Sequence, residues 1–88
     1  MKRGNPKMAR AALFEVIENQ LRANDPPETR ETLDRLMKGG HTREEAMKLI
    51  ACALVSEIYD VMKSHAPYDN ARYVATLKRL PELPWDDE

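Results

Sequence analysis

Apolar residues along the chain recur at intervals of three and four positions, the spacing that places them on one face of an α-helix. Four stretches show this pattern, and they cover residues 6–23, 26–38, 43–64 and 70–80. Strict alternation of apolar and polar residues, which is typical of a half-buried strand, does not occur. The pattern therefore predicts a compact all-α domain of about four helices.

Capping residues mark where these helices begin and end. Asn5 followed by Pro6 predicts a helix start. A proline at the first helical position has no backbone N–H, but that N–H would have no hydrogen-bond partner within the helix in any case. Asp25–Glu28 and Thr42–Glu45 have the spacing of a capping box, and we expect Asp25 to cap the second helix with Pro26 as its first residue. Gly39-Gly40 should end that helix, since glycine adopts positive φ without steric cost.

The third helix differs from the others because apolar residues cover about half of its circumference, more than a surface helix needs. Its apolar residues are Ala46, Met47, Ile50, Ala51, Ala53, Leu54, Val55, Ile58, Val61 and Met62. We expect this long helix to lie at the centre, covered mainly by Leu13, Val16, Ile17, Leu21, Leu33, Leu36, Met37, Val74 and Leu77. Because the other helices are short, part of the arc should stay exposed, and such patches usually mark interfaces.

Length and composition narrow the class of protein. The 88 residues suffice for one helical domain, residues 1–81, followed by an acidic tail, residues 82–88, that contains Trp85. A net charge of -1 gives no overall attraction to nucleic acid or to a membrane surface, and the longest apolar run is too short to span a bilayer. A single cysteine cannot form a disulfide within the chain, so we expect a cytoplasmic protein.

Few residues are candidates for catalysis or for metal binding. His41 and His65 flank the third helix and should lie on the order of 30 Å apart, too far to share a metal ion. Cys52 has no histidine one helical turn away that could activate its thiol. We therefore predict no catalytic residue, no bound metal and no cofactor.

Glu57 is the residue that breaks the apolar pattern of the third helix. A lone buried carboxylate is costly, so Glu57 needs a partner or access to water. It can pair with an arginine or a tyrosine of another helix, or act as a metal ligand or general base together with Glu15 or Glu18. A third interpretation is a polar contact across an oligomer interface.

Several short runs between residues 5 and 81 carry a resemblance. They are Glu18–Leu21, Asn24–Glu28, Thr32–Leu36, Glu45-Ala46, Glu57-Ile58, Tyr68-Asp69, Arg72-Tyr73 and Leu80-Pro81. Together they resemble a small, uncharacterised bacterial all-helical domain of unknown function, found alone or fused to other modules. Similar domains carry histidines where this chain has Asn5, Glu44 and Lys48, and two histidines at i and i+4 could bind a metal. This departure argues against a metalloprotein.

The sequence thus predicts a small non-enzymatic protein-interaction or oligomerisation module, with a homodimer as its expected form. Four apolar residues have no clear place in the expected core, and we assign them to the interface: Phe14, Met47, Met62 and Trp85. A metal-dependent or acid–base enzyme built on Glu57 is the alternative. Weak nucleic-acid binding through the basic N-terminus is a third possibility, and we expect no membrane association.

Overall fold

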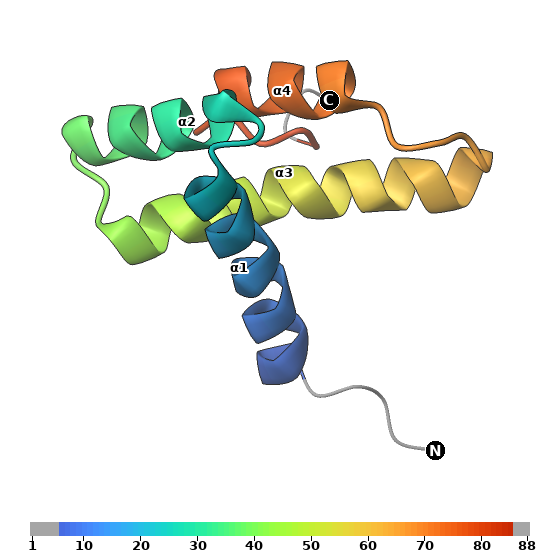
Figure 1. Ribbon diagram of the computed structural model, residues 1–88, viewed down its shortest axis with the longest axis horizontal. Helices are drawn as coiled ribbons and strands as arrows, with labels where there is room; N and C mark the ends of the chain where they lie inside the picture. Colours follow the sequence, from blue (N-terminus) through green and yellow to red (C-terminus); the bar gives the residue numbers. More distant parts are fainter. Residues whose placement is uncertain (1–5, 86–88) are drawn as a thin grey trace.

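The computed structural model describes residues 6–85, with side chains from residue 9 onward, and this part of the chain is all-α (Figure 1). The four helices are α1 (Pro6–Ala23), α2 (Pro27–Lys38), α3 (Arg43–Ser64) and α4 (Asn70–Arg79). Their number and order confirm the predicted fold class. The predicted cap Asn5 lies outside the described residues.

The predicted signals at the ends of α2, α3 and α4 are largely in place. The Thr42 hydroxyl accepts a hydrogen bond from the Glu45 N–H at 3.0 Å, and the Glu45 carboxylate accepts one from the Thr42 N–H at 2.9 Å. The Asp69 carboxylate caps α4 by accepting from the Arg72 N–H at 3.1 Å. Gly40 follows α2 with a φ of 108°, and the two N–H groups after Gly39 donate back to the last turn of that helix.

The predicted start of α2 was wrong by one residue. Pro26, expected as the first helical residue, has an extended conformation with φ of −75° and ψ of 149°, and Pro27 begins the helix. The reason is local, because a residue that precedes a proline is excluded from the α region, and Pro26 precedes Pro27. Pro26 therefore occupies the cap position, and no side chain caps this helix.

The helices are arranged around α3, which packs against each of the other three. α2 and α4 lie along one side of α3 and contact each other, whereas α1 crosses α3 at a steep angle (Figure 1). Beyond this crossing, the N-terminal half of α1 projects away from the other helices (Figure 1). α3 is therefore the central helix, as predicted from its apolar arc.

The core lies between one side of α3 and the inner faces of the other helices. Its buried apolar residues are Ile17, Leu21, Leu33, Leu36, Ala46, Met47, Ile50, Ala51, Ala53, Leu54, Tyr73, Leu77 and Leu80. Two residues expected here, Val16 and Met37, are each 42% exposed. Val16 is uncovered because it directly precedes the buried Ile17 and so points about 100° away from it around α1.

The chain after α4 packs back on the core instead of leaving the domain at once. The Arg35 guanidinium donates to the carbonyls of Leu77 and Leu80 at 2.9 and 2.6 Å, so it satisfies acceptors that the end of α4 leaves free. Leu83 is half-buried against the core. The first residues of the predicted acidic tail therefore lie against the helices, and this brings Trp85 to the side of α3.

Candidate functional site

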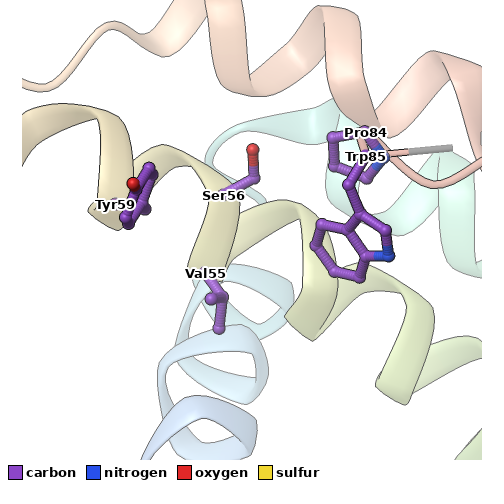
Figure 2. A pocket seen from close by; sticks show the side chains of 5 residues that line it. All are labelled: Val55, Ser56, Tyr59, Pro84 and Trp85. Atoms are coloured by element: carbon purple, nitrogen blue, oxygen red, sulfur yellow. The ribbon is translucent and has the colours of Figure 1, made fainter. Parts of the chain in front are cut away.

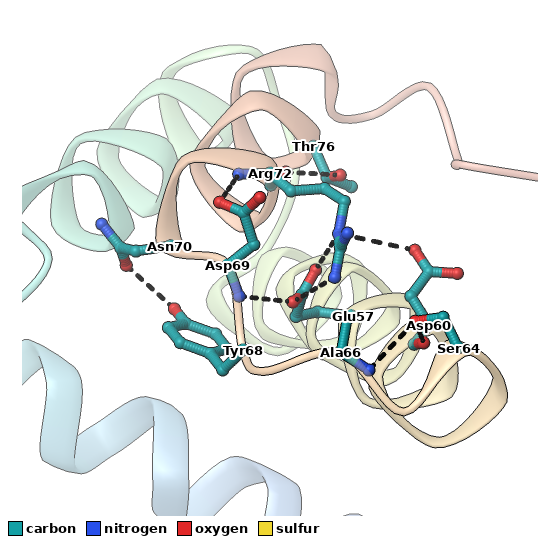
Figure 3. A network of polar contacts seen from close by, with 9 residues as sticks. All are labelled: Glu57, Asp60, Ser64, Ala66, Tyr68, Asp69, Asn70, Arg72 and Thr76. Atoms are coloured by element: carbon teal, nitrogen blue, oxygen red, sulfur yellow. Dashed lines mark hydrogen bonds and ion pairs between the residues drawn. The ribbon is translucent and has the colours of Figure 1, made fainter.

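Glu57 lies inside the protein with only 3% of its surface exposed, and its carboxylate is fully engaged (Figure 3). The Arg72 guanidinium of α4 donates to both carboxylate oxygens, at 2.8 and 2.9 Å. The backbone N–H of Asp69 adds a third hydrogen bond at 2.9 Å. The hydrogen bonds from Arg72 lower the pKa of Glu57 despite the opposing effect of burial, and the Asp69 N–H acts in the same direction.

This arrangement favours a structural role for Glu57. A carboxylate with three donors and a lowered pKa is a poor general base, because its basicity falls as those donors stabilise the charged form. Glu18 pairs with Arg43 at 3.0 Å on the surface of the protein, and Glu15 is exposed. The structure thus gives Glu18 and Glu57 different partners, and Glu57 pairs with an arginine of another helix, as the first interpretation proposed.

His41 and His65 flank α3, and Cys52 lies within that helix, where it lines a hollow together with His41. His41 precedes α3, whereas His65 follows it as an exposed residue with a φ of 58°. Cys52 is half-buried in α3, and this burial raises the pKa of its thiol. Within residues 6–85, no three side chains of histidine, cysteine, aspartate or glutamate lie close enough to hold a metal ion.

The outer side of α3 carries a row of apolar side chains that no other helix covers. Val55, Ile58, Tyr59 and Met62 follow one another at helical spacing, and they are 42%, 43%, 60% and 70% exposed. We call these four residues the α3 stripe. On the helical wheel they lie beside the core residues Met47 and Ala51, so they extend the apolar arc of α3 from the core toward solvent.

Two hollows adjoin the stripe and share Val55 and Trp85 as lining residues. The smaller has a volume of about 330 Å³ and lies between α3 and the chain after α4 (Figure 2). The larger, which we call the α1–α3 groove, has a volume of about 450 Å³. It is lined by Ala9, Arg10, Leu13, Phe14, Lys48, Ala51, Cys52, Val55 and Trp85.

Three of the four predicted interface residues lie at or near this surface. Phe14 lines the groove as a half-buried side chain, Trp85 is 51% exposed between the two hollows, and Met62 ends the stripe. Met47 is only 1% exposed and belongs to the core, where it has no surface to offer a partner. Val55, Ile58 and Tyr59 were not assigned to the interface, although the width of the apolar arc already indicated that some residues of α3 would stay uncovered.

The basic N-terminus lies mostly outside the described residues, since only Arg10 among its four cationic side chains is described, as an exposed residue. No helix in the described part of the chain is long and apolar enough to cross a membrane. Comparison with protein-family models, with curated proteins and with solved structures finds no match for this chain. The resemblance to a bacterial helical domain therefore stays a prediction.

Proposed function

We propose that this chain is a small, non-enzymatic protein-interaction module that forms a homodimer through the uncovered surface of α3. The observation that carries this proposal is the gathering of exposed apolar side chains on one surface. Five of the eight large apolar side chains that are exposed in residues 9–85 belong either to the α3 stripe or to Trp85. Contiguous apolar surface of this kind is typical of interaction sites, whereas single exposed apolar residues are ordinary.

The composition of the surface also suits association. Aromatic residues and methionine are enriched in the centres of protein interfaces, and this surface contains Tyr59, Met62 and Trp85. A symmetric homodimer is the commonest form of soluble assembly, and it lets one surface of a chain cover the same surface of another. We place the protein in the cytoplasm, where a lone cysteine such as Cys52 stays reduced.

Sedimentation velocity over a range of protein concentrations tests the proposal. We expect the mass of the wild-type protein to rise from that of a monomer to that of a dimer as concentration increases. Val55→Lys should keep the protein monomeric, because a lysine at the centre of the interface would be buried without a partner. Met37→Lys is the matched control, since Met37 on α2 is also 42% exposed but lies outside the surface.

The fold of both variants is checked by circular dichroism, because each replaced side chain is already partly exposed and should not be needed for folding. A wild-type protein that stays monomeric at high micromolar concentration would contradict the proposal. Equal loss of the dimer in the two variants would also contradict it, because it would show that the α3 surface has no special part in association.

A further inference from the structure

We propose that the α1–α3 groove is occupied by the projecting half of α1 from a second copy of this chain, and that the two copies exchange these segments reciprocally. We call residues 9–16 the α1 arm. The inference rests on the proposed homodimer and adds to it the identity of the segment that each copy inserts. It follows from three features of the structure: an unsupported helix segment, an open apolar groove beside it, and opposite charges at the two ends of the chain.

The α1 arm has little support within its own chain. The buried residues of α1 are Ile17 and Leu21, which both lie after the arm, whereas the arm holds only the half-buried Leu13 and Phe14. Figure 1 shows this half of α1 extending beyond its crossing with α3. Short helical segments are marginally stable in water unless an apolar face is packed, so the arm requires a partner surface.

The groove provides such a surface and is built partly from the arm itself. Ala9, Leu13 and Phe14 form its α1 side, and Ala51 and Val55 form its α3 side. Because the arm and the groove are adjacent in one chain, a two-fold axis between two copies places each arm in the groove of the other. The same residues of both copies then form the interface, which is the definition of an isologous interface.

The two ends of the chain carry opposite charges. The segment that leads into the arm is basic, with Lys2, Arg3 and Lys7, and the arm itself adds Arg10. Trp85 lines the groove, and the sequence continues after it with the acidic residues 86–88. Attraction between the basic start of one copy and the acidic end of another favours pairing of unlike ends over pairing of like ends. Such complementarity steers encounter and sets orientation more than it adds affinity.

A pair of alanine substitutions in the arm separates this proposal from association in general. Ala9 and Ala11 are both exposed and lie two residues apart in the same helix, but only Ala9 lines the groove. Ala9→Glu should raise the dimer dissociation constant about tenfold or more, because its larger side chain would fill part of the groove that the partner's arm must enter. Ala11→Glu, which makes the same chemical change on another side of the arm, should leave that constant within about twofold of wild type.

Trp85 supplies a second readout, because it is the one tryptophan of the chain and lines the groove. As the wild-type protein is concentrated, its emission should shift to shorter wavelength and become harder to quench with iodide, in step with the mass. Ala9→Glu should move both changes to higher concentration, and Ala11→Glu should not.

The possible outcomes distinguish the two proposals. A dimer that is equally stable in both variants, or one that forms without any change in Trp85 emission, would overturn arm exchange while leaving the homodimer in place. Equal weakening by both substitutions would likewise overturn it, because the groove side of the arm would then have no special role. A wild-type protein that remains monomeric would overturn both proposals.

Discussion

The ion pair between Glu57 and Arg72 joins the middle of α3 to the first turn of α4. A buried carboxylate loses its hydration, and this loss is offset only when several donors replace the water. Arg72 and the Asp69 N–H provide three such hydrogen bonds (Figure 3). The pair therefore fixes where α4 begins relative to α3, and one charged residue is tolerated in an otherwise apolar arc.

Glu57→Gln tests this account at the scale of the residue. The amide has nearly the same shape, but it is a weaker acceptor for Arg72 and cannot accept through both of its terminal atoms. We expect a loss of about 1–2 kcal/mol in the free energy of unfolding at neutral pH, measured by urea denaturation. Glu18→Gln makes the same change in the exposed pair with Arg43 and should cost less than about 1 kcal/mol.

The effect of Glu57→Gln should depend on pH in a defined direction. The pKa of Glu57 in the folded protein is lower than its usual value of 4.5, so the wild-type carboxylate stabilises the fold fully above that value. This contribution is lost as the pH falls through the lower pKa of the folded state, where the carboxylate takes up a proton. The difference between wild type and Glu57→Gln should therefore shrink in acid, and a constant difference would contradict the role assigned to the charge.

At the scale of the element, a helix end could be predicted where its capping hydrogen bonds join residues close together in the sequence. The Thr42–Glu45 capping box and the Asp69 cap each depend on residues within one turn, and both were predicted. The start of α2 was predicted one residue too early. Pro27 keeps the preceding Pro26 out of the α region, and this effect outweighs the capping signal of Asp25. The partner of Glu57 could only be named by type, since Arg72 reaches it through the packing of α4 on α3.

The connection between α2 and α3 allows a prediction with an internal control. Gly40 has a φ of 108°, which residues with a Cβ rarely adopt, whereas Gly39 has an ordinary φ of −79°. Gly40→Ala should cost about 1–2 kcal/mol of stability. At Gly39, an added Cβ would lie 3.4 Å from the nearest atom, the Leu36 carbonyl oxygen, so Gly39→Ala should be nearly neutral. Equal melting temperatures for the two variants would show that the turn does not need a glycine at position 40.

For the whole molecule, the decisive feature is that the other three helices do not cover the whole apolar arc of α3. The sequence indicated this imbalance, because the apolar arc was wider than a surface helix needs. It did not identify the uncovered residues, since these depend on the angle at which α1 crosses α3 and on the path of the chain after α4 (Figure 1). That path places Trp85 so that it lines both hollows together with Val55, and these two residues join the α3 stripe to the α1–α3 groove.

The central claim is that a second copy of the chain covers the outer surface of α3. The most direct test is an isotope-filtered NMR experiment on a mixture of labelled and unlabelled protein, which detects only contacts between copies. We predict intermolecular NOEs from the methyl groups of Val55 and Ile58, and none from those of Leu33 and Leu36 in the core. The absence of any intermolecular NOE to Val55 and Ile58 in concentrated protein would contradict the account.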